Sequence, residues 1–360
     1  MKVLIIGPIS SPIVRRLWGH LKTQNIEVKI ASHNAKGVEG VIDLGELKSF
    51  FDYLNFYKIN TIVTDFEPDI VHAHVLNHYG LMCAFQSKPL LVALWGSDVM
   101  LAPYQGAYFK KAIYKYINKY VLKKATRLHT SGIHVADEAG RQYKEAINKV
   151  DVFYWGFALQ KPENENFNTI AADLEQEFGI TGDDYIVFPR GLGPIYNPNI
   201  SAKIINALLD AGIEKKIIVF KGFATNEHET SFLGNVDRKK IIYVDRLLNE
   251  GELYSIYSRS TIHFSIPTSD SLGGGVVEPA LLGSFPILSN LPSYENYLCE
   301  NQGFMLKNFS DKSISLLVER IKNNEFHNSK SNMPKTKYNT KSVISNIIKT
   351  YNIAIEDGSR

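Results

Sequence analysis

Ser265-Ile-Pro-Thr-Ser-Asp270-Ser-Leu-Gly273-Gly274-Gly275-Val-Val-Glu278 has the pattern of a buried strand end, a polar loop, a glycine triplet and a helix start. Consecutive glycines let a ligand approach the backbone closely, and the free N–H groups at a helix start attract anions such as phosphate. Glu278 follows within the first turns and offers a carboxylate that can accept hydrogen bonds from a vicinal diol. The pattern favours a phosphate-binding loop over the alternative, a tight corner whose glycines serve packing and whose glutamate is solvated.

Outward from this stretch, short apolar runs alternate with helix-length patterns along the whole chain, which indicates an α/β fold with parallel sheets. Ligands of such folds bind outside the carboxyl ends of the strands. The strands are predicted at residues 2–6, 27–31, 70–72, 90–94, 127–129 and 150–153 in the first half, and at 185–188, 216–220, 241–244, 262–265 and 285–288 in the second.

The 360 residues suffice for two domains that each bury a core. We expect an N-terminal domain at 1–158, a polar linker at 159–184, a C-terminal domain at 185–340, and a final helix and tail at 341–360 that packs back toward the first domain. The two open sheets are expected to face each other across the linker.

Composition excludes several classes of protein. The apolar runs are strand-sized, so no transmembrane helix is predicted, and the first run is too short for a signal peptide. Two cysteines form neither a disulfide framework nor a zinc cage, which favours a cytoplasmic protein. The sequence has no P-loop pattern, no complete Gly-x-Gly-x-x-Gly and no Asp-x-Asp.

The spacing of two acids carries a resemblance. Asp270 and Glu278 have seven residues between them, which resembles the E-x7-E element of the retaining family 4 glycosyltransferases. The resemblance implies two facing Rossmann-like domains with a cleft between them, the GT-B architecture, and a nucleotide-diphosphate sugar as co-substrate with no metal or other cofactor. It also implies that Glu278 holds the donor ribose and that Asp270 contacts the transferred sugar. Asp270 replaces the usual glutamate and shortens the reach by one methylene.

A second element supports the donor site. Arg190, in Phe188-Pro-Arg-Gly-Leu-Gly-Pro-Ile195, resembles the strand-end arginine with which the family contacts the donor diphosphate. A guanidinium is permanently charged and binds phosphate through two parallel N–H groups. The alternative is an interdomain or surface arginine. Ile195 stands where the family has a lysine, and Lys221, at the end of the next strand, is the expected substitute.

The first half also has paired strand ends that resemble the family, Ile70-Val-His-Ala-His74 and Leu94-Trp95-Gly-Ser-Asp98. Many members have, at the position of Trp95, a histidine that contacts the donor sugar. We expect His74, Asn77 and Trp95 on the acceptor side. Asp98 either orients an acceptor hydroxyl or caps the segment that follows it.

Two further positions in the first half have open interpretations. His72 and His74 point the same way on a strand, and core or acceptor-side histidines are favoured over a metal site, so we expect no metal ligands. Gly7 closes the first strand; its loop is expected either to contact the donor phosphate or to serve simple helix capping.

One stretch combines positive charge with aromatic residues. No acid occurs between Asp98 and Asp137, and the spacing of apolar residues predicts an amphipathic helix at 106–125 with a basic face and an aromatic-rich face. Such a helix either lies on an anionic membrane surface or packs normally with solvated lysines. No nucleic-acid partner is expected, because no recognisable binding module accompanies the charge. The cations are Lys110, Lys111, Lys115, Lys119, Lys123, Lys124 and Arg127, and the apolar residues are Phe109, Ile113, Tyr116, Ile117, Tyr120 and Val121.

Together these features predict a metal-independent, retaining, nucleotide-sugar-dependent glycosyltransferase, cytoplasmic or peripheral on the inner face of the membrane. Arg190, Asp270 and Asp98 are the expected catalytic residues, and a saccharide or lipid-linked saccharide of lipopolysaccharide, capsule or a related glycan is the expected acceptor. Two alternatives stay open: a nucleotide-sugar 2-epimerase of the same fold, and a catalytically degenerate binding subunit.

Overall fold

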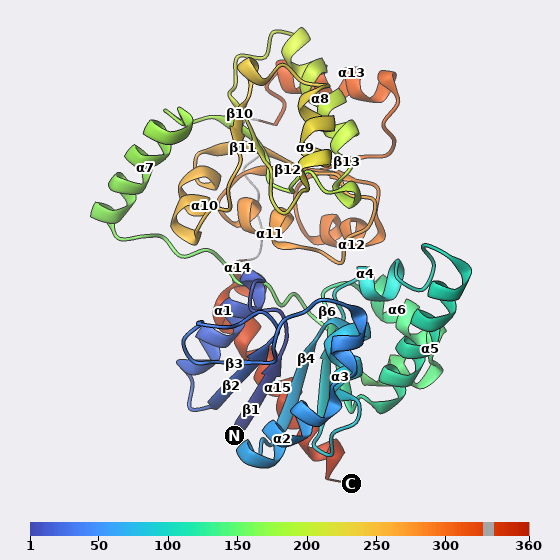
Figure 1. The fold of residues 1–360 in the computed structure, drawn as a ribbon. Helices are drawn as coiled ribbons and strands as arrows, with labels where there is room; N and C mark the ends of the chain where they lie inside the picture. Colours follow the sequence, from blue (N-terminus) through green and yellow to red (C-terminus); the bar gives the residue numbers. More distant parts are fainter. Residues whose placement is uncertain (327–334, 360) are drawn as a thin grey trace. The chain divides into compact units, whose positions relative to one another are not determined.

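The computed structural model describes residues 1–326 and 335–359, and the chain divides into two compact units (Figure 1). Unit 1 comprises Met1–Phe157 and Lys337–Arg360, and unit 2 comprises Ala158–Thr336. Each unit is built on its own parallel sheet, which confirms the predicted α/β fold class with two Rossmann-like halves. The cleft expected between the halves stays a prediction.

Unit 1 has seven parallel strands in the order β3-β2-β1-β4-β5-β6-β7 within the described residues. The strands are almost wholly apolar where they are central, as expected for a sheet that helices cover on both faces. The elements are β1 (Lys2–Ile6), α1 (Pro12–Lys22), β2 (Glu27–Ser32), β3 (Val41–Asp43), α2 (Phe56–Phe66), β4 (Ile70–His74), α3 (Gly80–Cys83), β5 (Leu90–Ala93), α4 (Ser97–Met100), α5 (Tyr108–Lys124), β6 (Arg127–Thr130), α6 (Ile133–Gln142), β7 (Val150–Val152) and α15 (Thr340–Gly358).

Unit 2 has six parallel strands in the order β10-β9-β8-β11-β12-β13 within the described residues. Its elements are α7 (Asn164–Phe178), β8 (Tyr185–Phe188), α8 (Pro198–Asp210), β9 (Ile217–Phe220), α9 (Asn226–Leu233), β10 (Ile242–Val244), α10 (Glu250–Tyr257), β11 (Ser260–Ser265), α11 (Gly274–Leu281), β12 (Phe285–Ser289), α12 (Pro292–Glu300), β13 (Phe304–Leu306) and α13 (Asp311–Lys322). The short helix α14 (Lys335–Tyr338) lies at the boundary of the two units.

The segment expected as a linker, 159–184, is instead largely a helix of unit 2. Helix α7 fills most of it, and its Leu174 is fully buried. The ring of Phe167 lies 6.2 Å from that of Tyr254 on α10. The polar composition of the segment misled the interpretation, because a helix needs only a narrow apolar stripe to pack on a domain.

The final helix, α15, belongs to unit 1, where it contacts β4, β5 and β6 (Figure 1). Its Tyr351 hydroxyl lies 2.8 Å from Nδ1 of His72, and the Thr350 hydroxyl donates to Asp151 at 3.1 Å. Helix α15 therefore completes the core around β4 and β6. Within the described residues, no helix is long and apolar enough to cross a membrane.

In unit 2 the strand order reverses between β8 and β11, which are neighbours in the sheet. The rings of Phe188 and Phe264 stack across this pair, with centroids 4.6 Å apart. The chain after β8 runs in one direction and the chain after β11 in the other, so their loops border the crevice in which open α/β sheets bind ligands. Arg190 and the loop that leads to Asp270 lie there.

Candidate functional site

Asp270 is the centre of the site in unit 2. Its carboxylate accepts hydrogen bonds from Nη2 of Arg190 at 3.0 Å, from the Gly273 N–H at 2.9 Å and from the Tyr294 hydroxyl at 2.8 Å. Tyr294, on α12, is fully buried and also contacts the Ser265 hydroxyl at 3.0 Å. Asp270 thus ties the strand end of β8, the start of α11 and α12 together, and it holds the guanidinium of Arg190 in place.

Two of the three glycines make room for Arg190. A Cβ atom at Gly273 would lie 2.4 Å from Nη1 of Arg190, and one at Gly275 would lie 2.4 Å from its Cδ. The arginine therefore lies directly on the first turn of α11, and any larger residue at either position would displace it. The sequence predicted these glycines for close approach of a ligand; the structure adds that they first admit the arginine.

Arg190 retains donor capacity in spite of its ion pair. Its side chain is only 15% exposed, and within the described residues its Nε has no hydrogen-bond partner. The ring of Tyr196 lies 4.8 Å from the guanidinium carbon. Burial acts to lower the pKa of Arg190, but the charge of Asp270 and the phenols of Tyr294 and Tyr196 outweigh it and raise the pKa above its ordinary value. The guanidinium is a permanent, largely desolvated cation.

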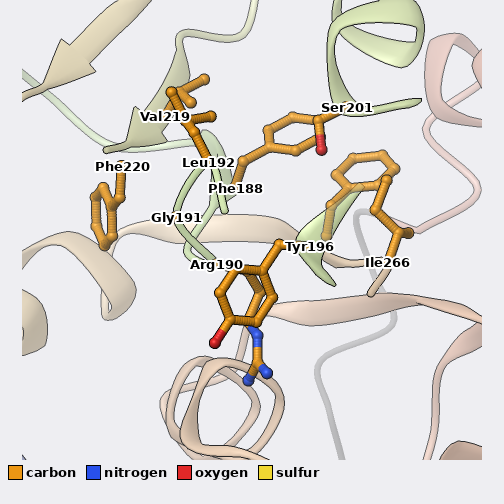
Figure 2. Close-up of a pocket in the computed structure, with 10 residues that line it drawn as sticks. Phe188, Arg190, Gly191, Leu192, Tyr196, Ser201, Val219, Phe220 and Ile266 are labelled. Atoms are coloured by element: carbon orange, nitrogen blue, oxygen red, sulfur yellow. The ribbon is translucent and has the colours of Figure 1, made fainter. Parts of the chain in front are cut away.

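Figure 2 shows how the polar end of Arg190 points away from the apolar residues around it, with Tyr196 alongside. The cavity drawn there encloses about 10 Å³, which is room for about one water molecule. It is lined mainly by apolar side chains between the ends of β8, β9 and β11. A ligand of nucleotide size must therefore bind outside it, at the exposed side of the guanidinium.

Glu278 lies one turn into α11, and its carboxylate folds back toward the helix start. A Cβ atom at Gly274 would lie 2.9 Å from Oε1 of Glu278. Gly274 and Gly275 occupy the first turn of α11, where backbone N–H groups lack an acceptor within the helix. The helix start thus combines a carboxylate, two N–H donors and the Arg190 cation.

Lys221 lies close to the site through its backbone. The Leu192 N–H donates to the Lys221 carbonyl at 3.0 Å, and a Cβ atom at Gly191 would lie 2.8 Å from the same oxygen. The ammonium itself is 2.6 Å from Glu229 on α9. The loops after β8 and β9 are therefore packed backbone to backbone, while the charge expected to substitute for the family lysine is neutralised by an acid.

In unit 1, Asp98 caps its neighbours and is not an open acid. Its carboxylate accepts the N–H groups of Leu76 at 2.9 Å, Trp95 at 3.1 Å and Val99 at 3.1 Å. Its carbonyl accepts the Asn77 amide at 3.3 Å. Burial raises the pKa of Asp98, and the backbone donors act against that rise. These bonds favour the capping alternative, because both oxygens hold the loops after β4 and β5 together; a catalytic role for Asp98 stays a prediction.

The other expected acceptor-side residues lie around the end of β4. Asn77 is buried against Asp98, and the ring of Trp95 lies 5.7 Å from that of Trp155 in a tilted arrangement. A Cβ atom at Gly7 would lie 2.9 Å from the Cβ of His74, so this glycine is needed for strand packing. His74 is fully buried, and within the described residues neither of its ring nitrogens has a hydrogen-bond partner.

Sequence reasoning missed a buried histidine chain in the same region. Nε2 of His72 lies 2.9 Å from Nε2 of His129 on β6, and the ring of His74 lies 4.3 Å from that of His72. Burial lowers the pKa of all three, that of His129 to about 3. The part of the chain that the structure describes has no group of three or more His, Cys, Asp or Glu side chains arranged to hold a metal ion.

Comparison with known structures places the fold. Anabaena HepE in complex with UDP-glucose matches with a TM-score of 0.75 at 13% identity, over 98% of this chain and 99% of that one. Sucrose-phosphate synthase from Thermosynechococcus elongatus matches with 0.74 at 12% identity, over 98% of both. UDP-GlcNAc 2-epimerase from Neisseria meningitidis matches with 0.62 at 13% identity, over 97% of this chain and 99% of that one. No curated protein gives a significant sequence match.

These likenesses show that the chain has the GT-B fold. Residues 2–131, within unit 1, match the glycosyl transferase 4-like family model. This match covers the half of the chain opposite to the motifs of unit 2, and it supports the resemblance to the family 4 glycosyltransferases stated above.

Proposed function

We propose that this protein is a retaining glycosyltransferase that moves a sugar from a nucleotide-diphosphate sugar to a hydroxyl of a saccharide or lipid-linked saccharide. The observation that carries the proposal is Arg190, a largely buried cation that lies on the start of α11 and whose Nε has no partner within the described residues. A diphosphate at the exposed side of the guanidinium would accept hydrogen bonds from it.

The arginine is suited to leaving-group stabilisation. Negative charge accumulates on the diphosphate as the bond to the sugar breaks, so donors fixed at that position bind the transition state more strongly than the ground state. Arg190 is fixed by Asp270 and by the two glycines beneath it before any ligand arrives. The N–H groups of Gly274 and Gly275 would add two more donors. In this proposal no metal is required.

The structure favours a positioning role for Asp270 over a role in binding the sugar alone. A carboxylate that already accepts three hydrogen bonds is better suited to positioning Arg190 than to binding the sugar alone. Glu278, next to Gly274, remains the proposed ribose ligand, since a carboxylate accepts both hydrogens of a vicinal diol.

A thermal-shift panel of UDP, GDP, ADP, CMP and their sugars tests the donor site. A ligand at a hundred times its dissociation constant adds about 2.7 kcal/mol to the free energy of unfolding. We expect one nucleoside diphosphate and its sugar to stabilise the wild type, and Glu278→Gln to lose most of that shift. Glu295→Gln, an exposed glutamate on α12, is the matched control and keeps it. No shift from any nucleotide would contradict the proposal and favour a binding subunit without turnover.

Product analysis separates transfer from epimerisation. The wild type incubated with the stabilising nucleotide sugar and no acceptor is expected to leave the sugar's configuration unchanged in NMR spectra. A second sugar nucleotide that differs at C2 would instead identify a 2-epimerase.

A further inference from the structure

Helix α5 exposes the aromatic residues that its sequence pattern assigned to one face. Tyr108 is 89% exposed, Phe109 75% and Tyr116 74%. Only Ile117 and Val121 of the predicted aromatic-rich face are buried. The side of α5 that packs on unit 1 carries Ile117, Asn118, Val121 and Leu122. Phe109 and Tyr116 of the predicted aromatic-rich face are therefore exposed, as are most lysines of the predicted basic face.

The exposed side of α5 has two adjoining edges. Lys115, Lys119 and Lys123 recur at four-residue spacing and form one edge, because residues four apart share a helix face. Phe109, Ile113 and Tyr116 are spaced by four and then three residues, so they form the other edge. We call these residues, with Tyr108, the α5 surface.

Aromatic side chains of neighbouring elements continue the α5 surface. The ring of Tyr120 lies 5.3 Å from that of Phe85, which lies 4.0 Å from Phe56 at the start of α2. Phe85 is 46% exposed, and Tyr57, the next residue of α2, is 81% exposed. Single exposed apolar residues are normal on a protein surface, whereas a group of exposed aromatic residues on adjoining elements marks an interaction site.

The charged residues of the α5 surface are all positive. No acid occurs from Val99 to Ala136. The nearest acid along the chain that packs on this region is Glu138, which is 10% exposed, accepts the Tyr104 hydroxyl and pairs with Arg141 at 3.0 Å. The lysines of the α5 surface therefore have no carboxylate of their own segment to neutralise them.

We propose that unit 1 docks on an anionic lipid bilayer through the α5 surface. Aromatic rings and lysines side by side suit the headgroup region, where rings bury their apolar part and ammonium groups meet lipid phosphates. A nucleic acid would use the same cations and could stack bases on the exposed rings, but it gains nothing from the aliphatic side chain of Ile113, which the headgroup region buries. The α5 surface belongs to unit 1 and the proposed donor residues belong to unit 2, so the membrane proposal can fail while the proposed function holds.

Vesicle sedimentation tests the charge of the surface. We expect the full chain to bind vesicles with about 30% phosphatidylglycerol at low salt and to bind pure phosphatidylcholine far more weakly. Each surface cation contributes about 1 kcal/mol, so Lys115→Gln with Lys119→Gln and Lys123→Gln lowers binding by about a hundredfold. The control changes three exposed lysines of unit 2, Lys239, Lys312 and Lys322, to Gln and is expected to have little effect.

A second pair of variants tests the aromatic edge. Phe109→Ser with Tyr116→Ser keeps every charge and is expected to lower vesicle binding by about tenfold, whereas Phe223→Ser, an equally exposed phenylalanine of unit 2, leaves it unchanged. Equal binding to both vesicle types, no binding at all, or release from anionic vesicles by a short oligonucleotide would overturn the proposal. All variants should keep the nucleotide shift of the wild type, which separates this test from that of the donor site.

Discussion

Arg190→Lys is expected to transfer sugar about a hundredfold or more slowly than the wild type. Removal of one fixed donor from a site of developing negative charge typically costs roughly 3–4 kcal/mol of transition-state stabilisation. Lysine keeps the charge opposite Asp270 but loses the planar fork and the Nε donor, which within the described residues has no other partner. Steady-state kcat with the nucleotide sugar identified by the thermal-shift panel is the measurement.

The control for this prediction is a second arginine of unit 2. Arg246 pairs with Glu177 and Glu252 away from the site, so Arg246→Lys should keep kcat. Arg190→Ala is less informative, because loss of one partner of a buried ion pair costs about 3–5 kcal/mol of stability. An unchanged kcat in Arg190→Lys, or an equal loss of kcat in Arg246→Lys, would contradict a catalytic role for Arg190.

Acid is expected to destabilise unit 1 steeply through its buried histidines. Burial holds the pKa of His129 at about 3 and those of His72 and His74 well below 6.5. Unfolded histidine binds a proton below about pH 6.5, whereas the folded state does not until far lower pH. The stabilisation is therefore fully present above about pH 6.5 and is lost as pH falls toward 3. Each histidine contributes about 1.4 kcal/mol per pH unit in that window.

The slope is measured by urea unfolding between about pH 6 and pH 4.5. His129→Gln is expected to reduce the pH dependence of the free energy of unfolding by about 1.4 kcal/mol per pH unit, whatever it does to stability at pH 7. His228→Gln, which changes a histidine at the start of α9 in unit 2, serves as the control. The raised pKa of Asp98 makes the protein more stable as pH falls, which opposes the effect of the histidines. Because the wild type and His129→Gln both contain Asp98, the difference between their two slopes isolates the contribution of His129. An unchanged slope in His129→Gln would show that His129 titrates normally.

The strands and the switch point of unit 2 were predictable because their signals are local. The apolar run before Arg190 and the apolar run before Asp270 each predict a buried strand that ends just ahead of the polar residue. That the two side chains bond to each other was not predictable: they are 80 positions apart, and the sequence assigned them to different parts of the donor. Tyr294, which completes the carboxylate's environment, lies in a helix with no motif.

The surroundings of a side chain that depend on the folded backbone could not be predicted. The position of Asp98 after a strand left a catalytic role and a capping role open, and only the folded chain shows that both of its oxygens accept backbone N–H groups. Helix α5 has an apolar periodicity, but periodicity does not say which apolar residues face the core. Phe109 and Ile117 belong to the same pattern, and one is 75% exposed while the other is buried.

The central claim is that unit 2 binds a nucleoside diphosphate through Arg190 and the start of α11. Calorimetric titration of the wild type with the nucleoside diphosphate chosen by the panel, and with the matching monophosphate, tests it most directly. A charge-assisted hydrogen bond contributes about 1.5–3 kcal/mol, so the diphosphate should bind at least about tenfold more tightly, and Arg190→Lys should remove most of that difference. Equal affinity for both nucleotides in the wild type would contradict the account.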